Sequence, residues 1–167
     1  MPREVLTLAV LFSLVAILPL TSFAADFTGR VVGISDGDTI SVMHGTRAEK
    51  IRLNGIDCPE KRQAFGQRAK QFTSKLAFGN DVVVKTFGRD RYGRTIGDVI
   101  LSDGRILNQE LVKAGLAWWY EKYSKDSTLG DLQEEARQAK RGLWVYPDPV
   151  PPWEWRHRLE PLQPGTH

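Results

Sequence analysis

Apolar and polar positions alternate with a period of two along the first part of the chain. Segments 27–34, 39–43 and 48–53 carry β-branched residues at alternating positions and are separated by turn-forming residues. The intervening His44-Gly45-Thr46 is typical of a tight hairpin between the second and third segments. The pattern therefore predicts a meander of three antiparallel strands.

The spacing then changes to that of a helix. In segment 63–78, Ala69, Phe72 and Leu76 recur at helical intervals, and the segment closes on Gly79-Asn80, a C-cap signal. A helix lying across the meander is predicted here.

The second half of the chain predicts two further strands and two further helices. The strands are expected at 81–85 and 95–101, the helices at 108–114 and 128–141, and the aromatic run 116–120 is expected to be extended or partly buried. Together these elements predict an α+β, mainly β fold, a five-stranded Greek-key barrel of the OB type with about three helices. Strand ends and loops of such barrels commonly hold nucleic acid.

The N-terminus has the layout of a secretory signal. Arg3 precedes an apolar run over 6–20, and small residues lead to a cleavage site after Ala24, which predicts a signal peptide over 1–24. The alternative is an uncleaved membrane anchor formed by residues 5–20, although this run is shorter than the ~20 residues that comfortably span a bilayer. Either interpretation predicts an exported protein, secreted or periplasmic.

The remaining chain divides into a domain over 25–146 and a Pro/Trp-rich tail over 147–167. About 140 residues suffice for one domain with one core. The tail is expected to be a linker or a strap over the surface. Its Trp153-Glu154-Trp155-Arg156 run either packs back on the barrel or forms a partner site.

The charge distribution suits a polyanionic partner. The net charge is +3, with a pI near 9.1, and removal of 1–24 takes away one charge of each sign. Two stretches, 61–75 and 85–94, concentrate basic residues, and each is either a solvated face or a surface for nucleic acid.

The sequence offers few histidine and cysteine residues for catalysis or metal binding. Cys58 is the single cysteine, which excludes an intramolecular disulfide, and the three histidines are far apart in the sequence. A zinc site or a histidine-based dyad is therefore disfavoured. A catalyst in this chain would use carboxylates, arginines and a hard metal ion.

Three short segments concentrate such groups. The first is Asp36-Gly37-Asp38-Thr39, where Gly37 is expected to permit a sharp turn and alternation places Asp38 on the apolar face of its strand. A carboxylate turned toward an apolar face needs a counter-charge. The second and third are 52–60 and 89–94, and each segment taken alone is equally consistent with a charged surface turn.

In this order and at these separations, the three segments resemble the active-site signature of the staphylococcal nuclease (thermonuclease) family. The shared pattern is Asp-Gly-Asp-Thr, an Arg followed by Asp-x-Pro-Glu, and Asp-x-Tyr-Gly-Arg. The similarity extends over residues 27–144. It implies an endonuclease that hydrolyses phosphodiester bonds of DNA and RNA with little sequence specificity and leaves 3′-phosphate ends.

The resemblance also implies a Ca²⁺ site. The carboxylates of Asp38 and Asp57 and the backbone carbonyl of Cys58 match the ligands, and Asp36 matches a supporting carboxylate that does not ligate. Calcium takes six to eight oxygen ligands, so places remain for water and a substrate phosphate. The site should therefore bind calcium weakly without substrate.

The resemblance to this family also implies which residues are catalytic. Glu60 matches the general base, or the group that orients the attacking water, and Arg52 and Arg94 match the arginines that grip the scissile phosphate. Two guanidinium groups and a divalent cation would oppose the charge that develops on the phosphate oxygens.

Two departures affect substrate contacts. The loop after Glu60 is shorter than in the archetype, and Glu121 stands where one of two nucleotide-lining tyrosines would be, with Tyr123 matching the other. Tyr120 or Trp119 could stack on a base instead, although core packing is the favoured role for the adjacent tryptophans. A monomer with no protein partner is expected, with membrane contact only if the N-terminal segment is retained. The alternative function is a non-catalytic OB-fold module that only binds nucleic acid.

Overall fold

The computed structural model describes residues 25–159 of the chain. The signal peptide or anchor predicted over 1–24 and the last residues of the tail lie outside this range. Among the described residues, no helix is long and apolar enough to cross a membrane.

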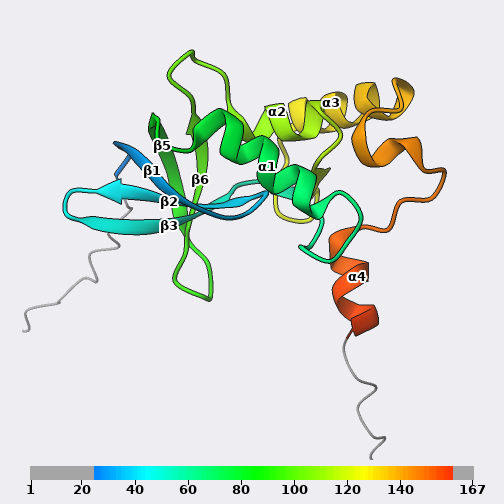
Figure 1. The fold of residues 1–167 in the computed structure, drawn as a ribbon, viewed down its shortest axis with the longest axis horizontal. Coiled ribbons are helices and arrows are strands. Elements are labelled where there is room, and N and C mark those ends of the chain that lie inside the picture. The colour runs from blue at the N-terminus through cyan, green and yellow to red at the C-terminus, as the bar shows by residue number, and fades with distance from the viewer. Residues whose placement is uncertain (1–24, 160–167) are drawn as a thin grey trace, which may run out of the picture.

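Five strands form a closed barrel (Figure 1). They are β1 (Phe27–Asp36), β2 (Thr39–His44), β3 (Arg47–Leu53), β5 (Asp81–Arg89) and β6 (Thr95–Ile100). The strand order is β1-β2-β3-β6-β5, with β3 and β6 parallel, the other pairs antiparallel, and β5 closing back on β1. The predicted five-stranded barrel is thereby confirmed.

Strand β5 is longer than the predicted 81–85. Apolar alternation ends near Lys85, but backbone pairing with β6 continues to Arg89↔Thr95 through a register shift between Thr86 and Gly88. The sequence pattern reports burial of side chains, whereas this extension depends on ladder hydrogen bonds.

Helices cover one end of the barrel. They are α1 (Gly66–Ala77), α2 (Leu107–Lys113) and α3 (Ser127–Gln138), followed by a 3₁₀ turn η1 (Gly142–Val145) and α4 (Pro152–Leu159). Figure 1 shows α4 standing apart from the barrel at the end of a long connection. Within the described part of the chain the predicted three helices are present, and α4 is a fourth, formed by the tail.

Helix α1 begins three residues later than predicted. Phe65, which precedes it, has a left-handed backbone with φ of 68°, and Gln63 to Gly66 form a turn instead of helix. This turn places the loop that carries Glu60 directly against the start of α1.

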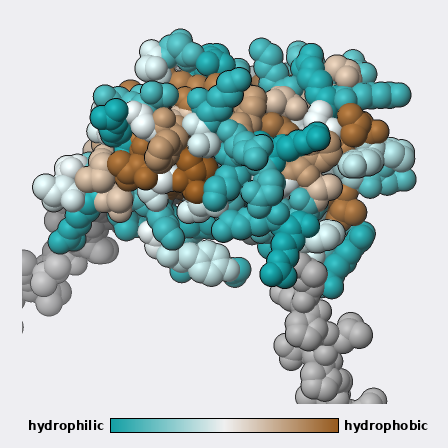
Figure 2. Space-filling model, viewed as in Figure 1, coloured by the Kyte–Doolittle hydropathy of each residue, from teal (hydrophilic) through white to brown (hydrophobic). Residues whose placement is uncertain are grey.

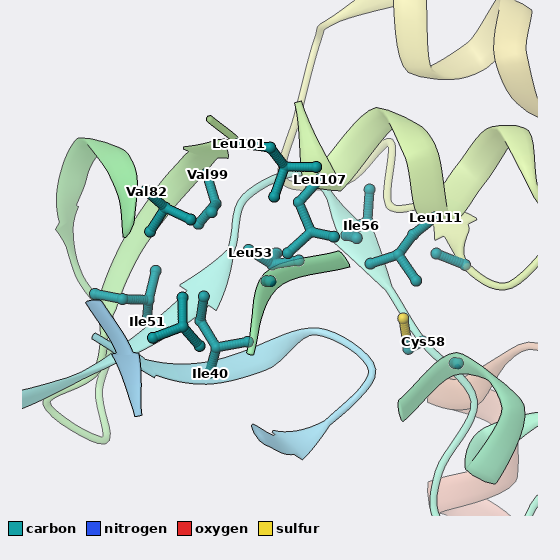
Figure 3. Close-up of a cluster of buried hydrophobic side chains, with 14 of the residues drawn as sticks. Ile40, Ile51, Leu53, Ile56, Cys58, Val82, Val99, Leu101, Leu107 and Leu111 are labelled. Atoms are coloured by element: carbon teal, nitrogen blue, oxygen red, sulfur yellow. The ribbon is translucent and has the colours of Figure 1, made fainter. Parts of the chain in front are cut away.

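The main core runs from the barrel to the helices without interruption (Figure 3). Ile40, Ile51 and Leu53 of the barrel are fully buried, as are Leu107 and Leu111 of α2. Each such side chain contributes roughly 1.5–3 kcal/mol of transfer free energy. The face seen in Figure 2 is mostly hydrophilic, with hydrophobic groups visible between the charged ones.

A second, smaller cluster lies beside the main core. Trp118, Ala136, Leu143 and Trp144 form it, and Trp153 of α4 packs against it. The core-packing role expected for Trp118 is confirmed, and Trp153 packs back on the domain, as one of the two interpretations of the tail predicted.

Candidate active site

The turn between β1 and β2 is held by α1. Thr73 donates through Oγ1 to the carbonyl of Gly37 at 2.6 Å. A Cβ placed on Gly37 would lie 2.7 Å from Cβ of Ala69 and 2.8 Å from Sγ of Cys58. The sharp turn expected at Gly37 is present between the paired residues Asp36 and Thr39, although Gly37 does not have a positive φ. The turn requires glycine because neighbouring atoms leave no room for a side chain.

Asp38 lies in an apolar setting, as alternation predicted. It is 6% exposed, and Ile40 and Val42 on the same face are fully buried. Its carboxylate accepts hydrogen bonds from Thr39 Oγ1 at 3.1 Å and from the backbone N–H of Cys58 at 2.7 Å. Arg52 Nη2 lies 3.3 Å from its Oδ2 and is the counter-charge that the buried position requires.

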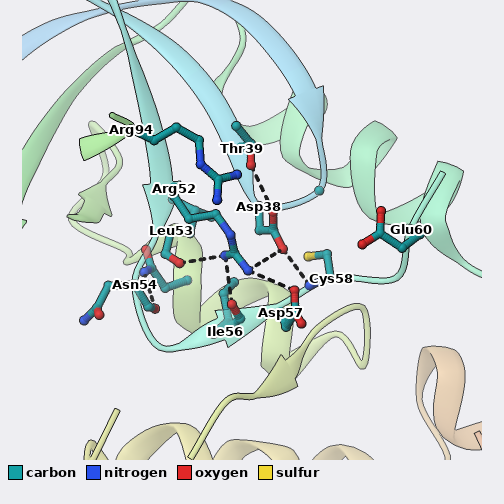
Figure 4. Close-up of polar contacts among 12 residues, drawn as sticks. Asp38, Thr39, Arg52, Leu53, Asn54, Ile56, Asp57, Cys58, Glu60 and Arg94 are labelled. Carbon is teal, nitrogen blue, oxygen red and sulfur yellow. Dashed lines mark hydrogen bonds and ion pairs between the residues drawn. The ribbon is translucent and has the colours of Figure 1, made fainter. Parts of the chain in front are cut away.

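Arg52 projects from β3 into the centre of the site, and most of its donors face the protein (Figure 4). Nη1 donates to the carbonyls of Leu53 and Ile56, at 2.9 and 2.8 Å, and Nη2 donates to Asp57 at 2.9 Å. Burial alone would lower the pKa of Arg52, but the charges of Asp38 and Asp57 outweigh it and raise the pKa. Arg52 is therefore a cation held in a fixed position. Its Nε takes no part in these hydrogen bonds.

Asp57 is positioned by a second, two-stranded sheet. Its strand β4 (Ile56–Asp57) pairs with β7 (Trp118–Trp119), which sets Asp57 opposite Trp118. Asp57 is 2% exposed. Burial raises its pKa, while Arg156 and Arg52 oppose the rise. Both arginines thus favour the ionised carboxylate and partly offset the effect of burial.

Glu60 lies at the solvent edge of the cluster, with its side chain 41% exposed. Its backbone N–H donates to Oε1 of Gln63, and a Cβ on Gly66 would overlap its carbonyl. Figure 4 shows Glu60 beyond Cys58, on the side away from Arg52. A carboxylate so placed reaches water while its backbone is fixed by the start of α1.

Arg94 reaches the site from the turn between β5 and β6. Asp90 braces this turn by accepting from the backbone N–H of Tyr92 and Arg94 and from Arg94 Nε at 2.6 Å. Figure 4 shows the Arg94 guanidinium directed toward Arg52 and Asp38. Within the described chain its Nη1 and Nη2 form no hydrogen bond, so a fork of two donors faces the site.

The structure therefore brings Asp38, Arg52, Asp57, Glu60 and Arg94 to one region from the three segments 36–39, 52–60 and 89–94. Cys58 lies among them with a buried thiol, whose pKa is raised well above its ordinary value by burial and then by Asp38. A neutral, enclosed thiol is not a nucleophile. This agrees with the expectation that only the backbone of Cys58 participates.

The oxygens of the site suit a hard cation but do not enclose one. Among residues 25–159, no group of three or more His, Cys, Asp or Glu side chains could hold a metal ion by itself. Two nearly buried carboxylates are present, and Oδ1 of Asp36 is buried without a hydrogen-bond partner among the described residues. Burial and then Asp38 raise the pKa of Asp36 to about 6. The carboxylates supply negative charge but too few ligands to surround a cation. This arrangement fits a Ca²⁺ ion whose remaining ligands are water and substrate phosphate.

The predicted nucleotide-binding tyrosines have different surroundings. Tyr120 stacks on Trp153 with ring centroids 4.9 Å apart and planes at 8°, and meets Tyr123 edge-on at 4.7 Å. Tyr123 is 65% exposed. One face of Tyr120 is therefore covered by the tail, and Tyr123 is the ring that a base could reach.

Arg156 and Gln63 were missed as parts of this site. Arg156 ion-pairs with Asp57 and Glu60, and Gln63 links the Glu60 backbone to the carbonyl of Val150. The spacing of Trp153 and Arg156, three residues apart, was the available signal, because helical residues so spaced share a face.

Comparison with known proteins identifies what the chain is similar to. Residues 50–146 match the model of a family described as staphylococcal nuclease homologue. An uncharacterized endonuclease of Escherichia coli O157:H7 is 54% identical over 134 residues, which cover 80% of this chain and 88% of the relative. A micrococcal nuclease of Shigella flexneri is 42% identical over 142 residues, covering 79% and 82%. An uncharacterized endonuclease of Haemophilus influenzae is 42% identical over 132 residues, covering 78% and 74%.

Proposed function

The chain belongs to the staphylococcal nuclease family, and we propose that it is an exported, Ca²⁺-dependent endonuclease that cleaves DNA and RNA and leaves 3′-phosphate ends. Hydrolysis of phosphodiester bonds in nucleic acid follows from the family. We propose, in addition, the dependence on calcium, the export of the protein, the 3′-phosphate ends of the products and the roles of individual residues.

One observation carries the assignment of the site. Arg52 is buried between the two carboxylates Asp38 and Asp57, while Arg94 and Glu60 approach the same region with groups available to a substrate. A non-catalytic binding module would have no need of a partly exposed carboxylate beside a buried charge cluster.

The roles follow from which atoms are available. Nη1 and Nη2 of Arg94 form a fork that matches two phosphate oxygens. Arg52 holds its charge in place and offers Nε, opposing the negative charge that grows on the phosphate in the transition state. Glu60 can accept the proton of the attacking water, because its carboxylate reaches solvent.

Asp38, Asp57 and the Cys58 carbonyl would hold the calcium ion. When bound, it would oppose phosphate charge and lower the pKa of a nearby water. The partnerless oxygen of Asp36 and the pair of buried carboxylates support this choice of residues.

The test of activity is digestion of end-labelled single-stranded DNA and RNA by the purified protein. We expect cleavage with Ca²⁺, none with EDTA, and poor cleavage with Mg²⁺. Products should act as polymerase primers only after phosphatase treatment, which reports 3′-phosphates. Glu60→Ser, purified identically, controls for contaminating nuclease. No cleavage of either polymer from neutral to alkaline pH would favour the non-catalytic module.

Export is tested separately by fractionating cells that produce the tagged chain. A product beginning at Ala25 outside the cytoplasm supports a cleaved signal, and a full-length product in the membrane fraction supports the anchor. Recovery in the cytoplasm alone would overturn export and leave the nuclease assignment intact.

A further inference from the structure

Helix α4 brings a third arginine into the proposed active site. Arg156 lies about 100 positions after the residues it contacts, and its Nη2 is 2.8 Å from Oδ2 of Asp57. Its Nη1 is 2.8 Å from Oε1 of Glu60. One guanidinium therefore bridges the proposed base and a proposed calcium ligand.

Glu60 depends on this contact for its orientation. It lies in a loop outside any strand or helix, and its side chain is 41% exposed. Among residues 25–158, no other side chain donates a hydrogen bond to its carboxylate. Without Arg156, none of the side chains of residues 25–158 would hold the Glu60 carboxylate in one rotamer by a hydrogen bond.

The tail is anchored next to the same loop. Trp153 stacks on Tyr120 and meets Trp118 edge-on at 5.8 Å. Gln63 accepts from the Glu60 N–H through Oε1 and donates through Nε2 to the carbonyl of Val150. The backbone and the carboxylate of Glu60 are therefore both tied to the tail.

We infer that Arg156 is a positioning residue of the nuclease, holding the Glu60 carboxylate toward the attacking water and fixing its separation from Asp57. This inference rests on the proposed function. A guanidinium suits the task because its rigid fork spans two carboxylates at once, which a lysine ammonium does not. Each carboxylate oxygen has two lone pairs, so contact with Arg156 leaves capacity for water or a cation.

A competing account uses the same contacts in the opposite sense. Arg156 could stand in for the cation at Asp57, and α4 would then obstruct calcium and substrate. The two accounts predict opposite effects of removing the side chain, which makes them separable by one set of variants.

The experiment compares Arg156→Ala and Arg156→Lys with Arg158→Ala. Arg158 lies on the same helix, pairs with Glu154 at 3.8 Å and lines a separate cleft with Trp144 and Tyr146, so it controls for loss of one positive charge. Expected is a fall in kcat of about 10- to 100-fold for Arg156→Ala, the range for residues that orient active groups. KM should stay within about twofold, because substrate contacts are unchanged.

Three further measurements separate positioning from a merely structural role. Millimolar methylguanidinium should restore part of the rate of Arg156→Ala and none to Arg158→Ala. Arg156→Lys, which keeps the charge and the helix, should lie between wild type and Arg156→Ala even if the alanine variant folds poorly. In a Glu60→Ser background, Arg156→Ala should cost nothing further, since it acts through Glu60.

Calcium binding supplies a readout independent of turnover. Calorimetry with Ca²⁺ and a cleavage-resistant phosphorothioate oligonucleotide should give equal or weaker calcium affinity for Arg156→Ala than for wild type. Tighter binding, or a higher rate at limiting calcium, would overturn the inference in favour of obstruction. An unchanged kcat, or an equal loss in Arg158→Ala, would also overturn it. Failure of wild type to cleave would instead defeat the proposed function, on which the inference depends.

Discussion

Arg52 Nη2 lies 2.9 Å from Oδ1 of Asp57, and the two side chains are only 16% and 3% exposed. The same nitrogen is 3.3 Å from Asp38, so one buried cation serves two buried carboxylates. Removing one partner of a buried pair leaves an uncompensated charge, which is far more costly than removing an exposed pair.

We predict that Arg52→Gln lowers the free energy of unfolding by about 3–5 kcal/mol in EDTA. Calcium should recover part of this loss, because a cation at Asp38 and Asp57 replaces the missing charge. Urea denaturation with and without Ca²⁺ measures both effects. Arg89→Gln is the control, since the Arg89 side chain, which pairs with Glu49, is 60% exposed and pairs of exposed charges contribute about 0–1 kcal/mol. Equal losses in the two variants would contradict the prediction.

Arg94 is expected to behave differently, because its fork is directed at substrate. Arg94→Gln should lower kcat/KM by about 10²–10³, the cost of losing one donor aimed at developing charge. Its free energy of unfolding should change little, since the Arg94 side chain is 29% exposed and its ion pair, with Asp90, lies within its own turn. Nuclease kinetics measure the change in kcat/KM, and thermal denaturation measures the change in stability. The neighbouring Arg91→Gln is the control for both. A large loss of stability with intact kinetics would reverse the assignment.

The contrast between Asp38 and Arg156 shows how far the sequence determines such a site. Asp38, Arg52 and Asp57 sit at strand ends, where alternation and local order fix side-chain direction, and the barrel was predictable from the same periodicity. Asp38 on an apolar face even indicated that a cation must lie nearby.

Arg156 could not be placed in this way. Its contacts with Asp57 and Glu60 cross nearly 100 residues and depend on how the proline-rich strap crosses the surface, which no local pattern reports. Gly37 shows the same limit at short range, because its need for glycine arises from Ala69 and Cys58, in other elements. The position of Arg156 and the requirement for glycine at position 37 therefore depend on long-range packing, which sequence periodicity does not report.

Gly37 accordingly gives a packing prediction. Gly37→Ala should lower the free energy of unfolding by about 1–3 kcal/mol, because the new methyl group would overlap Cβ of Ala69 and Sγ of Cys58. Calcium affinity should also fall, since the turn carries Asp38. Gly33→Ala is the matched control on the adjoining strand β1, where a Cβ meets Ser41 at an ordinary 3.4 Å. Denaturation and calcium titration of both variants test this, and equal stabilities would show that the turn adjusts freely.

Asp36 should make the stability of the calcium-free protein depend on pH. Its pKa is raised from 3.8 to about 6 by burial and then by Asp38, so the folded state retains a proton that the unfolded state loses. Below about pH 4 both states are protonated and the carboxyl imposes no penalty. As pH rises through about 6, the folded state must ionise a buried group, and stability is lost.

Asp36→Asn should therefore be more stable than wild type at pH 7 in EDTA, with the advantage shrinking toward pH 4. Calcium should reduce the advantage at pH 7, because a cation at Asp38 favours the ionised Asp36. Asp103→Asn provides the opposite sign, since hydrogen bonds from Arg105 lower the pKa of Asp103 and its stabilisation is lost as pH falls. Thermal denaturation from pH 4 to 8 measures both. An Asp36→Asn advantage that does not change with pH would show that Asp36 is ionised without penalty in the folded protein.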